Sequence, residues 1–280
     1  MLSKVRCFFI VALIIPLAAF GSFESLFAPK SEPWPRWEAH DPDSNMRVDH
    51  RFWDIFLQRY VSVSEDGVNR VDYNAVTAAD KAALDAYLDR LAATRVSALR
   101  RASQLAYWIN LYNALTVRTI LAHYPVASIR DIDISPGLFS DGPWGKPLTA
   151  VAQTPLSLND IEHRILRPIW RDPRLHYALN CAALGCPNLQ DRAFTVGNTP
   201  ALLDDAARAF INNPRGARVS GDTLTLSSLY VWYAEDFGGG ETGVLEHLKK
   251  YAQPDLLEAL DTVTVIENDY NWSLNELRSN

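Results

Sequence analysis

The stretch LHYALNCAALGCPN contains the residue types of thiol chemistry, with His176, Cys181 and Cys186 close together. A cysteine thiolate is a strong nucleophile, and a nearby histidine both generates and stabilises it. An acid or amide that orients the imidazole completes such a site, and Asn180 is one candidate for this role. The pattern therefore favours a thiol hydrolase in which Cys186 is the nucleophile and His176 the base.

Alternation of apolar and polar residues predicts that this stretch begins as a β-strand. Side chains in a strand point to opposite faces in turn, so His176 and Asn180 should share one face and Cys181 the other, more apolar face. We expect Cys181 to be buried, and the turn through Gly185 to return Cys186 toward His176.

Glu162 is the acid most suited to act with His176. In LSLNDIEHRILR it stands four residues from both Leu158 and Leu166, on the apolar stripe of a predicted helix that Ser157 begins. A buried acid needs a partner, which is either a catalytic histidine or a structural contact such as an arginine or backbone amides. Both alternatives stay open from the sequence.

WINLYN lies within a nearly all-apolar helix predicted from about residue 98 to 123, and places Asn110 and Asn113 on one face. A buried amide left without hydrogen bonds costs about 1–3 kcal/mol, so each asparagine must have a partner. The favoured interpretation is that they brace a loop, such as residues 125–155, because most buried polar side chains bond backbone. The alternative is a ligand pocket, in which an amide donates to an oxyanion and Trp108 and Tyr112 contact the ligand.

A disulfide is the main alternative to a reactive thiol. Cys181 and Cys186 are the only cysteines after the N-terminal region, and in an oxidising compartment a pair this close is often bridged. The protein would then be a non-catalytic binding or structural domain. A metal site made by His176, Glu162 and the cysteines is a third, weaker hypothesis, because no second Cys or His pair follows. We therefore predict no metal and no cofactor.

Residues 1–21 have the pattern of a cleavable signal peptide, with Lys4 and Arg6 before an apolar run that Pro16 interrupts. The run is shorter than the roughly 20 residues of a membrane-spanning helix, so we expect a periplasmic or secreted protein without stable membrane insertion. Residues 22–47, rich in Pro, Trp and acids, are expected to form an extended arm or a linker before a single globular domain at 48–280.

The composition limits the class of partner. The chain has 280 residues, 48% of them hydrophobic, and a net charge of −6. An acidic surface argues against nucleic acid, so a small molecule or a peptide is the expected ligand. Helical patterns dominate and short strands lie among them, which predicts an α+β fold with several helices around the 98–123 helix and a small, mainly antiparallel sheet.

Several blocks in order resemble the domain-of-unknown-function family 547 (DUF547): VDYNAV, AYWINLYNALTVRTIL, SIRDI, LSLNDIEHRILR, LHYALNCAALGCPNL, LTLSSLYVWYAEDFGG and YNWSLN. The resemblance runs from about Val48 to the C-terminus, with Asn271 where an acid is expected. It implies a single, often exported domain and supplies no activity. A central helix followed by a histidine-bearing strand is also similar to the core of papain-like and transglutaminase-like thiol enzymes, although their nucleophilic cysteine opens the helix and this helix has none.

Overall fold

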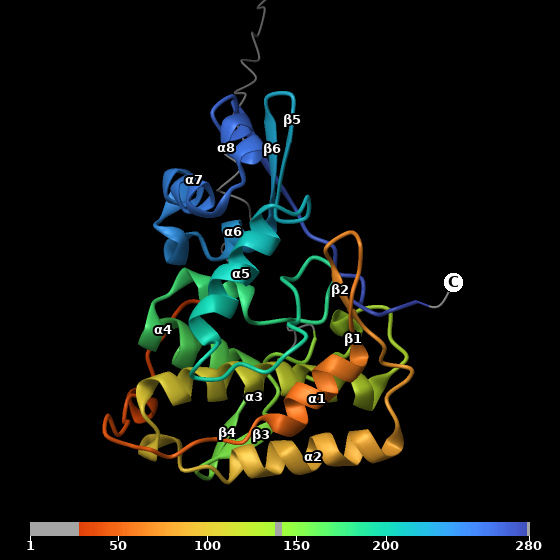
Figure 1. Cartoon of the computed structure of the whole chain (residues 1–280), viewed down its shortest axis with the longest axis vertical. Coiled ribbons are helices and arrows are strands. Elements are labelled where there is room, and N and C mark those ends of the chain that lie inside the picture. Colours follow the sequence, from red (N-terminus) through yellow and green to blue (C-terminus); the bar gives the residue numbers. More distant parts are fainter. Residues whose placement is uncertain (1–27, 138–141, 279–280) are drawn as a thin grey trace, which may run out of the picture.

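A computed structural model describes residues 28–137 and 142–278 (Figure 1). The predicted signal peptide and its cleavage site lie outside these residues. The N-terminal half contains α1 (Arg51–Tyr60), β1 (Val61–Val63), β2 (Asn69–Val71), α2 (Ala78–Ala92), η4 (Val96–Ala98), α3 (Arg101–His123), η5 (Ile129–Asp131), β3 (Thr149–Val151) and β4 (Thr154–Leu156). The C-terminal half contains η6 (Asp160–Leu166), α4 (Arg167–Trp170), η7 (Pro173–Tyr177), α5 (Thr199–Ile211), β5 (Ala217–Ser220), β6 (Thr223–Ser227), α6 (Ser228–Trp232), η8 (Ala234–Phe237), α7 (Gly240–Tyr251), α8 (Pro254–Leu260) and β7 (Val265–Asp269).

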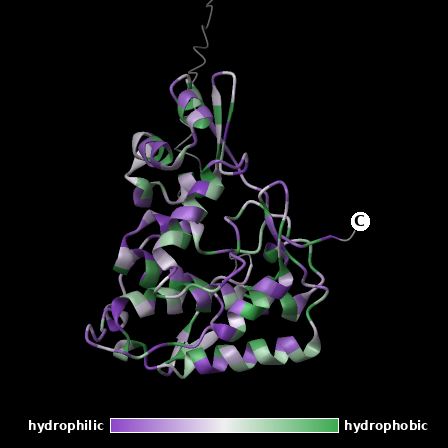
Figure 2. Cartoon of the chain, viewed as in Figure 1, coloured by the Kyte–Doolittle hydropathy of each residue, from purple (hydrophilic) through white to green (hydrophobic). Residues whose placement is uncertain are grey.

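Helix α3 is the central buried helix, as its sequence predicts. Almost every residue from Ala106 to Leu121 is buried, and the helix ends at His123, just before Tyr124-Pro125. Helix α2 packs against α3. Its buried residues Leu84, Tyr87, Leu88 and Leu91 are three and four positions apart, a spacing that predicts a helix with one apolar stripe. Figure 2 shows hydrophilic and hydrophobic residues alternating along α2, which is typical of a helix with one solvent face.

The strands form three small sheets rather than one. Two are antiparallel hairpins, β1–β2 and β3–β4, and the third has the order β5-β6-β7. Strand β7 pairs parallel with β6, while β5 pairs antiparallel with it. The described residues thus form a single α+β domain with mainly antiparallel pairing, as predicted.

The strand predicted at the start of LHYALNCAALGCPN is wrong. Residues 175–181 do not form a strand: Asp172 accepts a hydrogen bond from the Arg174 amide and begins the 3₁₀ helix η7, and irregular backbone follows. Local side-chain capping therefore prevailed over the apolar alternation in this segment. Similar capping forms the 3₁₀ helix η5 in SIRDI, where the Ser128 amide donates to the Asp131 carboxylate.

The helix that carries Glu162 begins as expected. The Ser157 amide donates to the Asp160 carboxylate, and the Asp160 amide donates to the Ser157 hydroxyl. Residues Asp160–Leu166 then adopt π-helical turns, in which the Arg167 amide bonds to the Glu162 carbonyl. Pro168 has no amide proton, so the carbonyl of Arg164 has no α-helical partner and accepts a bond from the Trp34 amide at 3.1 Å instead. The arm before α1 is held on η6 in this way, and π turns often occur at functional sites.

The hydrophobic residues form two clusters. The larger surrounds α3, and the smaller gathers Tyr177, Phe210, Tyr230 and Phe237 from η7, α5, α6 and η8. The smaller cluster matters for the site because it anchors η7 next to η8, although they are far apart in sequence. His176 stands directly before the anchored Tyr177, so its position is fixed by that packing.

Candidate functional site

A cleft of about 570 Å³ opens where η6, η7, α6 and the C-terminal tail meet. Its wall is rich in aromatic side chains, so we call it the aromatic cleft: Tyr112, Trp144, Trp232, Tyr233, Tyr270 and Trp272. Glu162, His176, Cys181 and Cys186 also line it. The sequence-predicted catalytic residues therefore lie in one cleft, although the role of each stays a prediction.

His176 is bound by a residue that the sequence reasoning missed. Its Nε2 lies 2.7 Å from the Asp236 carboxylate, which also accepts a hydrogen bond from Arg167 Nε at 2.6 Å. Burial tends to raise the pKa of Asp236, but the hydrogen bonds from His176 and Arg167 outweigh it and hold that pKa well below its usual range. Asp236 is therefore a fixed anion that orients the imidazole.

The opposite edge of the imidazole faces Glu162. His176 Nδ1 lies 3.8 Å from Glu162 Oε1, and Glu162 is only 8% exposed, which confirms its predicted burial. Tyr233 stacks on the His176 ring with a centroid distance of 4.3 Å. Because Asp236 occupies the Nε2 edge, Nδ1 is the ring nitrogen left to act as a base.

His163 and Tyr112 surround Glu162 with neutral groups. Burial lowers the pKa of His163 to about 4, and its Nδ1 lies 3.1 Å from the Arg167 guanidinium, which donates to it. Burial raises the pKa of Tyr112 well above its ordinary value, and the charge of Glu162 adds to that shift. At neutral pH His163 is therefore uncharged and Tyr112 keeps its hydroxyl proton.

Cys181 and Cys186 form a disulfide. The expectation of a free Cys186 thiol within hydrogen-bond reach of His176 is therefore wrong for this structure, in which no hydrogen bond joins these two described residues. The expected burial is also reversed: Cys186 is only 2% exposed, whereas Cys181 is half-buried. The strand face that should have buried Cys181 does not exist.

The Cys186 sulfur has two hydrogen-bond donors. The Cys181 amide lies 2.9 Å from Cys186 Sγ, and the Tyr270 hydroxyl lies 3.1 Å from it. Burial raises the pKa of Tyr270 above its ordinary value, so the hydroxyl remains a donor at neutral pH. Donors at this sulfur would stabilise a thiolate after reduction.

The C-terminal tail holds the loop that contains the cysteines. The Gly185 amide donates to the Asn271 carbonyl at 2.8 Å, and the Leu184 amide donates to the Ser273 carbonyl at 2.8 Å. A Cβ on Gly185 would come within 2.8 Å of the Asn271 nitrogen, so only glycine fits there. Ala182 has φ 60°, a left-handed conformation that costs a residue other than glycine about 1 kcal/mol.

Asn110 and Asn113 are braces for two different loops. Asn113 accepts a bond from the Asn180 amide at 2.9 Å and donates to the Ala178 carbonyl at 2.8 Å. Asn110 makes the same two bonds to the backbone of Phe194 alone. The favoured interpretation is confirmed, but the braced loops follow η7 and precede α5, and are not residues 125–155.

The other predicted binding residues, Asn180, Trp108 and Tyr112, differ in whether they line the aromatic cleft. Asn180 is buried, donates to the Pro187 carbonyl and accepts from the Ala182 amide, so it shapes the cysteine loop and does not orient His176. Trp108 is fully buried and packs edge-on against Trp37, so the prediction that it contacts a ligand is wrong. Of the predicted binding residues, Tyr112 alone lines the aromatic cleft.

Sequence reasoning missed Asp236, Arg167, Tyr233 and Tyr270. The signal for Asp236 is EDFGGGE, where acids stand beside glycines that allow a tight turn; Gly238 has φ 107°. This signal is weak because acids next to glycines are typical of ordinary loops. Among residues 28–137 and 142–278, no group of three or more His, Cys, Asp or Glu side chains is arranged to hold a metal ion.

Comparison with known proteins confirms the predicted resemblance for the middle part of the chain. Residues 96–211 match DUF547, a family of proteins of unknown function. The matched segment contains α3, Glu162, His176 and both cysteines, whereas Asp236 lies beyond it. No curated protein and no solved structure matches the chain. Within the described residues, no helix has the length and apolarity needed to cross a membrane.

Proposed function

We propose that this protein is an exported hydrolase of amide or peptide-like bonds whose nucleophile is the Cys186 thiolate. One observation carries the proposal: Cys186, Glu162 and a His176 imidazole fixed by Asp236 line the same cleft. The disulfide with Cys181 is then the resting form of the site. Its presence also supports export, because disulfides persist mainly in oxidising compartments.

The chemistry starts with reduction. A dithiol reductant supplies two electrons and two protons, becomes a disulfide itself, and releases the thiols of Cys181 and Cys186. Reduction frees the Cys186 side chain to turn toward His176, which then accepts its proton at Nδ1. The Cys181 amide and the Tyr270 hydroxyl, which contact the Cys186 sulfur in the oxidised form, stabilise the thiolate. Glu162 and Asp236 stabilise the imidazolium from its two sides.

The thiolate then attacks the carbonyl carbon, and the imidazolium returns its proton to the leaving amine. Water, deprotonated by His176, hydrolyses the resulting thioester and regenerates the Cys186 thiol. The aromatic walls suit the side chains of a peptide or another amide of comparable size. Asn110 and Asn113 do not donate to the oxyanion in this account, because both amides are bonded to backbone.

The test uses p-nitrophenyl acetate, an activated ester that acylates reactive thiolates whatever the natural substrate. We expect the reduced protein to release a burst of nitrophenolate and to gain one acetyl group on Cys186, and the oxidised protein to do neither. Cys181→Ala should give the burst without reductant, because it leaves Cys186 unpaired. Cys186→Ala is its matched control and should give none; a burst in that variant, or its absence from Cys181→Ala, contradicts the proposal.

A further inference from the structure

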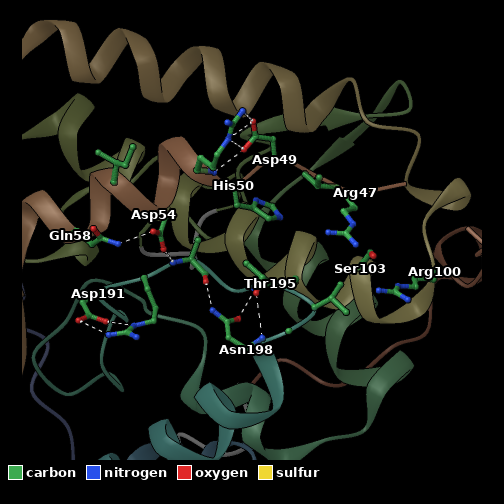
Figure 3. Close-up of a pocket in the computed structure, with 18 residues that line it drawn as sticks. Arg47, Asp49, His50, Asp54, Gln58, Arg100, Ser103, Asp191, Thr195 and Asn198 are labelled. Carbon is green, nitrogen blue, oxygen red and sulfur yellow. Dashed lines mark hydrogen bonds and ion pairs between the residues drawn. The ribbon is translucent and has the colours of Figure 1, made fainter. Parts of the chain in front are cut away.

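A second cleft, of about 1130 Å³, lies between the start of α1, the start of α3 and the loop before α5 (Figure 3). We call it the arginine cleft because Arg47, Arg51, Arg100 and Arg192 line it. Its basic side chains contrast with the net charge of −6 of the whole chain. Nothing in the chemistry of the aromatic cleft uses it.

The four arginines fall into two pairs. Arg51 and Arg192 are neutralised by ion pairs with Asp49 at 2.6 Å and Asp191 at 2.9 Å. Arg47 and Arg100 have no ion pair or side-chain hydrogen bond to any other described residue. Two guanidinium groups of the cleft thus have no ion-pair partner among the described residues. Asp54 also lines the cleft, where it accepts hydrogen bonds from the Gln58 side chain and the Ala193 amide, so the arginines outnumber the acids of the cleft by one.

Ser103 adds a buried polar group at the same place. The residue is only 7% exposed and lines the cleft, yet its hydroxyl makes no hydrogen bond within residues 28–137 and 142–278. Figure 3 shows Arg47, Ser103 and Arg100 converging from two segments of the chain. A hydroxyl of a mostly buried residue that opens into a cleft and has no protein partner is suited to bind a ligand atom.

The end of α3 adds the field of its dipole. Arg100 is its N-cap, no side chain caps the first-turn amides, and the first turn has no acid. The Ser103 amide is bonded to the Arg100 carbonyl at 2.9 Å, and Arg101 and Ala102 do not line the cleft, so the helix gives the cleft no free amide, while the positive end of its dipole favours an anion nearby. His50 also lines the cleft and is uncharged at neutral pH, because burial lowers its pKa to about 4.

We propose that the α3 end of the arginine cleft binds the phosphate group of a small phosphomonoester through Arg47, Arg100 and Ser103. The guanidinium and hydroxyl donors come from two segments of the chain (Figure 3). A tetrahedral group with three terminal oxygens satisfies such a set, whereas a carboxylate has only two oxygens in one plane. The volume of the cleft leaves room for the organic part of the ligand beyond the phosphate.

The experiment is calorimetric titration of the oxidised full chain with inorganic phosphate and with glycerol 3-phosphate, at constant ionic strength. We expect saturable binding of both. The double variant Arg47→Ala/Arg100→Ala should weaken binding at least tenfold, and Ser103→Ala about threefold. Arg95→Ala is the matched control, because this exposed arginine lies outside the cleft, and it should change binding less than twofold.

Two further titrations distinguish a phosphate from a carboxylate, and a free phosphate from one carried by a lipid. Acetate titrated in the same buffer tests for a carboxylate, and phosphatidic acid in phosphatidylcholine vesicles tests for a phosphate carried by a lipid. Phosphate binding that the double variant weakens, free or on vesicles, supports the site. Acetate binding as tight as phosphate, equal binding by wild type and double variant, or no saturable binding in any arm overturns it.

Discussion

The aromatic cleft and the arginine cleft differ in how their polar groups are partnered. In the first, His176, Asp236 and Arg167 are bonded to one another, and the Cys186 sulfur already has its donors. In the second, Arg47, Arg100 and Ser103 have no side-chain partner among the described residues. Groups fixed by each other are suited to act on a substrate, whereas unpartnered donors are suited to hold one.

Helix α3 supports both clefts, with one asparagine for each. Asn113 holds the backbone at Ala178 and Asn180, next to the Cys181 that lines the aromatic cleft. Asn110 holds Phe194, between two residues that line the arginine cleft. The amides of WINLYN thus position the two clefts without contacting a ligand themselves.

The largest expected effect is on the free energy of unfolding, when one of the two asparagine side chains that brace the loops is removed. Asn113→Ala leaves a buried amide and a buried carbonyl unpartnered, so the free energy of unfolding should fall by about 2–4 kcal/mol. Asn110→Ala should cost a similar amount, and urea denaturation measures both.

The same two variants test whether the clefts are separate. Asn113→Ala should slow acylation of reduced Cys186 and leave phosphate binding unchanged, and Asn110→Ala should do the reverse. If each variant impairs both functions equally, α3 does not support the two clefts independently.

The next largest effect is on the rate of Cys186 acylation in the aromatic cleft. Asp236→Asn removes the anion that holds His176, so acylation of Cys186 in the Cys181→Ala background should slow about a hundredfold, within the usual range for general-base catalysis. Glu235→Gln changes the neighbouring exposed acid and should have little effect. A rate for Asp236→Asn equal to that of Glu235→Gln would show that Asp236 is not a positioning residue.

Each cleft also has a buried neutral histidine, which makes stability depend on pH. Burial lowers the pKa values of His50 and His163 to about 4, below the value of 6.5 for an exposed histidine. Between these values the unfolded chain binds more protons, so stability decreases as the pH falls from 6.5 to 4, by on the order of 1–3 kcal/mol per histidine.

Urea denaturation at several pH values checks this dependence. His50→Gln and His163→Gln should each reduce the slope within that window. An unchanged slope in both variants would mean that these histidines are not neutral in the folded protein.

The smallest effect concerns the cysteine loop. Ala182→Gly removes the cost of a left-handed conformation, so the oxidised protein should gain about 0.5–1 kcal/mol in free energy of unfolding. Ala183→Gly is the control and should not stabilise, since Ala183 is not among the residues with positive φ. If both variants change the free energy of unfolding equally, the backbone at Ala182 is not strained.

The elements set by local sequence were predictable. The spacing of apolar residues located α2 and α3, and Ser157 with Asp160 located the start of the helix that carries Glu162. These features depend on residues a few positions apart, so sequence alone contains the information.

The site was predictable only in part. Glu162 and His176 could be named from burial patterns and residue type, but Asp236 lies 60 residues after His176 and meets it through the packing of the smaller cluster. Arg47 and Ser103 likewise come from distant segments. The strand predicted for residues 175–181 was wrong for two reasons that alternation does not show. Asp172 caps η7 locally, and Asn113, distant in sequence, bonds the backbone at Ala178 and Asn180.

The most direct test of the central claim is the rate of Cys186 alkylation as a function of pH in the full chain, with each label assigned to its cysteine by peptide mass. Without reductant, Cys181 and Cys186 should take no label, native or denatured. After reduction, Cys186 should react with a midpoint well below the free-cysteine pKa of about 8.5, and His176→Ala should raise that midpoint. A midpoint at or above 8.5 that His176→Ala does not change would contradict an activated thiolate in the aromatic cleft.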